Sequence, residues 1–251
     1  MKTTFYDFIY SGFSISIILA VSYSVLHFFI APFTKVYLGD FHTIVEFFLF
    51  LLCYGLLSGF AIQVFLKMKP FQYGEFSMDH SQFTYWKLIT VIYLLGEFCL
   101  LPFTTIFTKP LIARIFGAKI GKNVAIAGSI DDPYSVVIGD NSIIGHGSLV
   151  SGNFTLNGKI HFGKVIIGNY VTIGVNSVVS PDTEIGDNSI LSIGAVLLSG
   201  SKMPSNEIWR GNPARTWQSI VTKKSSIINP FEVSHETRNY QSSQPIKNNL
   251  G

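Results

Sequence analysis

The sequence predicts an N-terminal α-helical membrane domain followed by an all-β, left-handed parallel β-helix of hexapeptide repeats. Three observations support this: a six-residue apolar repeat in the second half, long apolar stretches in the first half, and a sharp change in composition between them. We therefore divide the chain into a membrane domain over residues 1–116, a β-helix over residues 117–217 and a polar tail over residues 218–251. The tail has no periodicity, and we expect it to be flexible.

The β-helix prediction depends on a branched apolar residue that recurs every six positions, usually followed by Gly or Ser. Each unit fits one short strand and one corner, and equivalent side chains would stack ~4.8 Å apart in successive coils. No unit can bury its own apolar face, so the core exists only because the coils stack. The small residue relieves crowding at the corner or permits a positive φ. The recurring positions are Ile120, Ile126, Ile138, Ile144, Val150, Ile167, Ile173, Val179, Ile185, Leu191 and Leu197.

Two stretches of the first half, residues 8–31 and 43–66, are long and apolar enough to span a bilayer, which needs ~20 residues. A third stretch, residues 83–107, contains Lys87, Glu97 and Pro102 and has basic residues before and after it. Because basic flanks stay cytoplasmic, both of its ends belong on one side, which favours a re-entrant or interfacial segment bent near Gly96 or Pro102. The alternative is a true third span. The loop between the first two stretches carries only Lys35 as a basic residue, so we expect the β-helix in the cytoplasm.

Charge and cysteine content narrow the possible partners. The net charge of +3 and the lack of a basic stripe with interleaved aromatic residues argue against nucleic acid. Cys53 and Cys99 lie in separate apolar segments, where they resemble small buried hydrophobic residues. The sequence therefore indicates neither a disulfide framework nor a metal site.

The repeat breaks once, over residues 153–164, and this segment predicts a loop extruded from the β-helix. Loops on rigid scaffolds often carry function. His146 lies at a corner just before the break and His161 lies within it. A histidine has a pKa suited to general base catalysis, so either residue is a candidate base. For each, the alternative is a solvated surface histidine.

Three segments carry a family resemblance: DDPYSVVIGDNSIIG, GKVIIGNYVTIGVNSVVSPDTEIGDNSILSIGAVLLSG and MPSNEIWRGNPAR. Together they resemble the left-handed β-helix acyltransferases of the hexapeptide superfamily over residues 117–217. A further resemblance, carried by KMKPFQYGEFSMDHSQFTYWK and PLIARIFGAKIG, extends forward to about residue 55. It is to the membrane-embedded β-helix repeats of polylysine-synthetase-type nonribosomal peptide synthetases and to their stand-alone relatives.

The resemblance implies transfer of an acyl group, usually acetyl, from coenzyme A to a hydroxyl or amine. It also implies a site between the subunits of a homotrimer, a histidine base and no metal. In soluble relatives the catalytic histidine would fall at Asn153, which cannot act as a general base. His146 or His161 would then supply the base, with Asn153 orienting substrate or polarising a carbonyl. The resemblance places acetyl-CoA near Gly174, Ser177, Gly194, Ala195 and Asn212. As cationic donors, Lys202 and Arg215 are candidates to bind the coenzyme phosphates, and the alternative for each is a solvated surface charge.

The expected function is that of a multi-pass protein of the inner (cytoplasmic) membrane that acetylates a hydroxyl of a glycan or lipid-linked acceptor. A membrane domain joined to a transferase makes most sense when acceptor or product lies at the membrane, so we also expect membrane lipid as a partner. Two alternatives stay open. One is a non-catalytic trimeric scaffold, suggested by Asn153 in place of histidine. The other is an N-acyl or peptide-forming activity on an amine.

Overall fold

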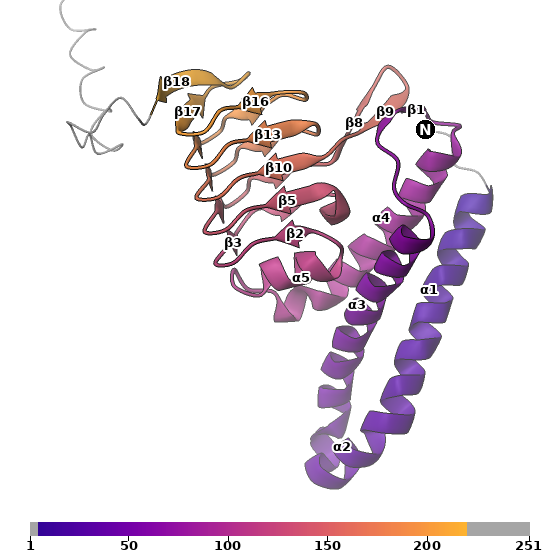
Figure 1. The fold of residues 1–251 in the computed structure, drawn as a ribbon. Helices are drawn as coiled ribbons and strands as arrows, with labels where there is room; N and C mark the ends of the chain where they lie inside the picture. The colour runs from indigo at the N-terminus through magenta and orange to yellow at the C-terminus, as the bar shows by residue number, and fades with distance from the viewer. Residues whose placement is uncertain (1–4, 220–251) are drawn as a thin grey trace, which may run out of the picture.

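The structure is a computed structural model that describes residues 5–219 (Figure 1). It consists of an N-terminal helical bundle and a parallel β-solenoid that stands beside one end of the bundle. The predicted polar tail lies outside the described residues, apart from its first two positions. The two-part fold class expected from the sequence is confirmed.

The bundle begins with a long helical hairpin. Helix α1 (Phe5–Val25), the π-helical turn η1 (Leu26–Ile30) and α2 (Ala31–Leu38) form one continuous helical run. Pro32 has no N–H for the ladder and its ring collides with the preceding turn, which explains the π-turn just before it. The chain reverses at Gly39 (φ 50°) in η2 (Gly39–Phe41), and α3 (His42–Met68) returns antiparallel beside α1 (Figure 1).

Small residues let α4 (Ser81–Leu100) approach α3 closely. A Cβ on Gly96 would lie 2.7 Å from Cβ of Ser58, which no real contact allows. Helix α4 passes Gly96 without a break and ends at the turn η3 (Leu101–Phe103), which contains Pro102. Of the two bend positions expected from the sequence, only the proline therefore ends the helix. The short helix α5 (Lys109–Ile115) leads into the solenoid.

The solenoid has three parallel sheets, and each complete coil contributes one strand to each of them in turn. The first sheet contains β2 (Lys119–Ile120), β5 (Val136–Ile138), β10 (Val165–Ile167), β13 (Thr183–Ile185) and β16 (Lys202–Met203). The second contains β3 (Ala125–Ile126), β6 (Ile143–Ile144), β11 (Thr172–Ile173), β14 (Ile190–Leu191) and β17 (Glu207–Arg210), closed by the antiparallel β18 (Arg215–Ser219). The third contains β4 (Ser129–Ile130), β7 (Leu149–Val150), β12 (Val178–Val179) and β15 (Val196–Leu197).

The predicted apolar positions form the solenoid core. Ile138 pairs with Ile167, and Ile144 with Ile173, so equivalent side chains stack coil on coil, and every recurring position is buried. The glycines that follow are needed for close backbone approach: a Cβ on Gly139 would lie 2.6 Å from the carbonyl carbon of Gly168. Positive φ occurs instead at other corner positions, most of them asparagine, a residue type that tolerates it. These asparagines are Asn123, Asn141, Asn176, Asn188 and Asn206.

The extruded segment is a β-hairpin rather than an irregular loop. Strands β8 (Asn153–Leu156) and β9 (Lys159–Phe162) leave the solenoid between the third and first sheets, and β1 (Gly74–Ser77) pairs with β9. Because β1 lies between α3 and α4, this small sheet joins the bundle to the solenoid (Figure 1). Side chains alternate across it, so Ile160 and Phe162 pack with Phe83 and Trp86 of α4 while His161 lies on the other face.

Helix α4 is also bonded directly to the first coil. Tyr93 donates a hydrogen bond of 2.8 Å to the carbonyl of Ile130, and Trp86 Nε1 donates one of 2.9 Å to Oδ1 of Asp132. Just beyond η3, Lys109 donates to the carbonyl of Gly128. The bundle and the solenoid are therefore held together by specific polar contacts as well as by the small sheet.

Candidate active site

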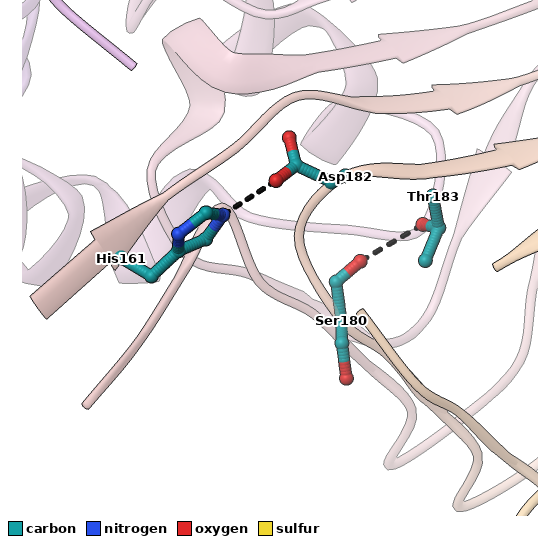
Figure 2. Close-up of polar contacts among 4 residues, drawn as sticks. All are labelled: His161, Ser180, Asp182 and Thr183. Carbon is teal, nitrogen blue, oxygen red and sulfur yellow. Dashed lines mark hydrogen bonds and ion pairs between the residues drawn. The ribbon is translucent and has the colours of Figure 1, made fainter. Parts of the chain in front are cut away.

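The hairpin brings His161 to a carboxylate from the next coil of the solenoid. Nε2 of His161 lies 2.5 Å from Oδ2 of Asp182 (Figure 2). An Nε2–H that donates to this carboxylate leaves Nδ1 with its lone pair available to accept a proton. The pair therefore has the chemistry of an oriented general base.

Local backbone features hold both partners in place. Asp182 has a φ of 57° in a tight turn that Pro181 enters and that Thr183 closes by donating to the carbonyl of Ser180 (2.8 Å; Figure 2). Its Oδ1 lies against Gly163, where a Cβ would come within 2.3 Å, so the carboxylate can approach only because residue 163 is glycine. The turn thus points the carboxylate at the root of the hairpin.

The hairpin supports the imidazole of His161 from its neighbouring strands. His161 pairs with Phe154 of β8, and the two rings lie 5.0 Å apart between centroids. On its other side it pairs with Glu75 of β1. The side chain is 24% exposed, so it is fixed by its neighbours and still open to a substrate.

A hollow of about 190 Å³ lies beside His161 on the same face of the small sheet. Lys159 and Glu75 form an exposed ion pair of 2.5 Å within it. The hydrogen bond from Lys159 lowers the pKa of Glu75, so this carboxylate is ionised at neutral pH. The hollow offers one cation, one anion and the Phe154 ring to a small polar acceptor. Its lining consists of Glu75, Phe154, Leu156, Asn157, Lys159 and His161.

Asn153 stands at the position where the family resemblance expects histidine, and its side chain makes a structural hydrogen bond. Its Nδ2 donates to Oδ2 of Asp132, a carboxylate that is 5% exposed and also accepts from Trp86 and Tyr134 (2.9 Å each). Burial raises the pKa of Asp132, and the three donated hydrogen bonds oppose that effect. Asp132 is therefore the acceptor that joins the bundle, the first coil and the hairpin.

His146 lies elsewhere. It is exposed at the corner between β6 and β7, which joins the second and third sheets, whereas the hairpin emerges where the third sheet passes to the first. Within residues 5–219, no side chain hydrogen-bonds the His146 ring, although its carbonyl accepts from the Asn176 amide (3.0 Å). Of the two candidate bases, only His161 has a carboxylate partner in the part of the chain that the structure describes.

The structure places some of the expected coenzyme residues together and separates others. Gly174, Gly194 and Asn212 follow one another up the corner that also carries His146, and Gly194 (φ 66°) faces open space. Ser177 and Ala195 belong to the same corner but are fully buried, so they can shape a surface only through their backbone.

The two expected cationic residues lie on different sheets, Lys202 on the first and Arg215 on the second. Lys202 lies on the first sheet and pairs with Glu184 at 3.2 Å, with both side chains exposed. Arg215 begins β18, is exposed, and donates to the adjacent carbonyl of Ala214 (3.0 Å). Within the described residues neither cation forms an ion pair with a buried carboxylate, and only Arg215 follows closely on the Asn212 corner.

Sequence reasoning missed Asp182. The available signal was a Pro-Asp pair inside an otherwise regular hexapeptide unit, one coil beyond the hairpin. The hexapeptide pattern does not predict the path of the hairpin, which brings His161 to the corner that carries Asp182.

Comparison with known proteins identifies the repeat. Residues 164–199 match the family model described as bacterial transferase hexapeptide (six repeats). The putative acetyltransferase YvoF of Bacillus subtilis is 32% identical over 110 residues, which are 42% of this chain and 61% of that protein. Galactoside O-acetyltransferase of Escherichia coli is 33% identical over 99 residues, 37% of this chain and 48% of that protein.

Other matches show how far this similarity reaches. A mitochondrial γ-carbonic anhydrase of Arabidopsis thaliana is 30% identical over 144 residues, 49% of this chain and 51% of that protein, so the repeat alone does not assign a reaction. A solved galactoside acetyltransferase in complex with coenzyme A is 23% identical, with a TM-score of 0.43 over 51% of this chain and 78% of that one. The chain spans about half to three-fifths of the length of the first curated relatives it matches.

Proposed function

Because residues 164–199 carry a bacterial transferase hexapeptide repeat and the relatives include acetyltransferases, we propose that this chain is an acyltransferase. It would move an acetyl group from acetyl-CoA to a hydroxyl of a membrane-associated glycan or lipid-linked acceptor. The observation that carries the proposal is the pairing of His161 with Asp182 beside an open hollow.

The proposed chemistry uses one base and needs no covalent enzyme intermediate. Nδ1 of His161 takes the proton from the acceptor hydroxyl as its oxygen attacks the thioester carbonyl carbon. The new C–O bond forms, the C–S bond breaks, and the imidazolium returns the proton to the departing coenzyme A sulfur. Asp182 keeps Nε2 protonated and stabilises the imidazolium while the proton is held.

The arrangement of residues supports an assembly with more than one copy. In one chain the His161 pair and the Gly174, Gly194 and Asn212 corner lie at different corners of the solenoid. A homotrimer could bring the donor corner of one copy to the hairpin of the next. Apolar side chains exposed on the second sheet and its corner, Ile143 (51%), Ile190 (37%), Val175 (40%) and Ile193 (75%), fit such a contact.

The bundle supports a place in the membrane. The structure has two helical runs long and apolar enough to cross a bilayer, Phe5–Met68, which contains the α1–α3 hairpin, and Ser81–Phe103. Helix α3 has 27 residues, about 40 Å of helix, against the ~30 Å hydrocarbon layer. Large apolar side chains of the helical hairpin α1–α3 point outward, as expected of a lipid-facing surface. The exposed fractions are 70% for Phe28, 65% for Phe33 and 65% for Phe60.

We place α1–α3 across the inner membrane and the solenoid on the cytoplasmic side. Lys67 lies in the last turn of α3 and Lys69 directly follows it, at the end nearest the β8–β9 hairpin, which agrees with basic residues on the cytoplasmic side. Helix α4 is hydrogen-bonded to the first coil through Trp86 and Tyr93. The segment from Trp86 to Tyr93 therefore lies at the same depth as the first coil of the solenoid. This favours an interfacial α4 over a third full span.

Incubation of the purified chain with radiolabelled acetyl-CoA and membrane fractions tests the proposal. We expect label in a lipid or glycan fraction, released by mild base as expected for an ester. Base-stable label on an amine would favour the N-acyl alternative. No coenzyme A release with any acceptor fraction would favour the non-catalytic trimeric scaffold.

A further inference from the structure

A second hollow lies at the end of the bundle nearest the β8–β9 hairpin, between α1, α4 and Lys69, the residue that follows α3. Its volume is about 560 Å³. We call it the tyrosine hollow, because Tyr6 and Tyr10 of α1 and Tyr85 of α4 form its walls together with Ser11, Thr84 and Lys69. It is separate from the His161 hollow, which lies on the far face of the small sheet.

Lys69 gives the tyrosine hollow its charge. Its ammonium lies 4.9 Å from the centroid of the Tyr85 ring, and Tyr85 in turn donates to the Lys69 carbonyl (2.8 Å). No carboxylate of the described chain forms an ion pair with Lys69. Asp7, the acidic residue of the lining, forms a mostly buried ion pair with Lys87. The cation of the hollow therefore remains available to an anion.

The remaining lining suits a phosphate at a membrane surface. Ser11, Ser81 and Thr84 add hydroxyl donors beside the lysine, and such donors bind phosphate oxygens well. Tyr6 and Tyr10 stack with centroids 6.4 Å apart, and tyrosines gather where a bilayer meets water. Just along α1, Phe8 (68%) and Phe13 (67%) are exposed and offer apolar surface to chains that hang from such a headgroup.

We propose that the tyrosine hollow binds the phosphate headgroup of an anionic membrane lipid, with Lys69 as its counter-ion. The site rests on the membrane placement proposed above and not on the transferase reaction. It would fix the depth of the bundle in the cytoplasmic leaflet. Since β1 begins five residues after Lys69 and pairs with the strand that carries His161, lipid binding would also fix the position of the hairpin relative to the membrane.

Native mass spectrometry of the full chain in detergent, titrated with phosphatidylglycerol or with phosphatidylcholine of the same acyl chains, tests this directly. We expect selective retention of phosphatidylglycerol, weakened about fivefold by Lys69→Gln and retained in Lys69→Arg. Lys67→Gln is the matched control: it removes the same charge at the same helix end, outside the hollow. Soluble glycerol phosphate in a separate arm asks whether phosphate alone suffices, and we expect it to compete poorly.

Equal retention of the two lipids, or equal weakening by Lys67→Gln and Lys69→Gln, would overturn the site and show only a diffuse surface charge. Competition by glycerol phosphate as strong as that by the lipid would overturn the lipid as occupant. The readout is independent of acetyl transfer, so an inactive chain that still selects phosphatidylglycerol would contradict the proposed reaction and leave the lipid site standing.

Discussion

Asn153 donates a hydrogen bond to the buried carboxylate of Asp132, and this contact fastens the root of the hairpin to the first coil. The same carboxylate accepts from Trp86 of α4, so one acidic side chain joins three segments that are far apart in the sequence. The amide is thereby committed to structure at the position where the family resemblance expects a base. In the proposed reaction, the base is His161, which lies on the hairpin that this contact positions.

Replacing Asn153 should therefore loosen the fold more than it removes chemistry. Asn153→Ala leaves a buried carboxylate with one donor fewer, which costs about 1–3 kcal/mol of unfolding free energy. Asn153→Asp should cost more, because it sets a second negative charge beside Asp132. Denaturant unfolding of both variants checks this. A stable Asn153→Ala protein that has lost all activity would instead make Asn153 catalytic.

Trp86→Phe keeps an aromatic ring but removes the N–H that donates to Asp132. That hydrogen bond lowers a pKa which burial raises, so its loss should raise the pKa of Asp132 further. The lost bond matters most when Asp132 is ionised. The variant should therefore be destabilised by about 1–3 kcal/mol at pH 7 and by less once the pH falls below the raised pKa. Unfolding at pH 4 and pH 7, beside the wild type, measures the difference. A cost that is the same at both pH values would contradict it.

Asp182→Asn tests the orientation of the base without emptying its site. The residue is half-exposed on a turn, so the variant should fold normally. Its amide oxygen can still accept from Nε2, but the negative charge that stabilises the imidazolium is gone. We expect kcat to fall by roughly tenfold or more with little change in KM for acetyl-CoA. Glu184→Gln, two residues along the same coil, is the control and should leave kcat unchanged.

The close contact between α3 and α4 predicts that alanine substitutions at two glycines, Gly96 and Gly12, change stability differently. Gly96→Ala places a Cβ 2.7 Å from Cβ of Ser58, and overpacking of this kind costs about 1–3 kcal/mol. Gly12→Ala, in α1, adds a Cβ that meets nothing within 4 Å, so it should be neutral or stabilising by up to about 1 kcal/mol. Thermal unfolding in one detergent compares them. Equal effects would argue against close helix contact at Gly96.

The sequence was informative where its pattern is periodic. The recurring positions from Ile120 to Leu197 predicted the solenoid core, because stacking makes each unit repeat the last. The segment from Asn153 to Lys164 has no such period, and the strand that pairs with its hairpin, β1, is distant in the chain. The partner of His161 was missed for the same reason: Asp182 meets it through tertiary folding, 21 residues along the chain.

The most direct test of the central claim compares His161→Ala with His146→Ala in transfer of radiolabelled acetyl from acetyl-CoA, using the full chain in membranes. We expect His161→Ala to lower kcat by about 10²–10⁴-fold, because His161 has the carboxylate partner and the adjoining hollow. His146→Ala should stay near the wild-type rate, because its ring is solvent-exposed. Loss of activity in His146→Ala alone, with His161→Ala unaffected, would contradict the account.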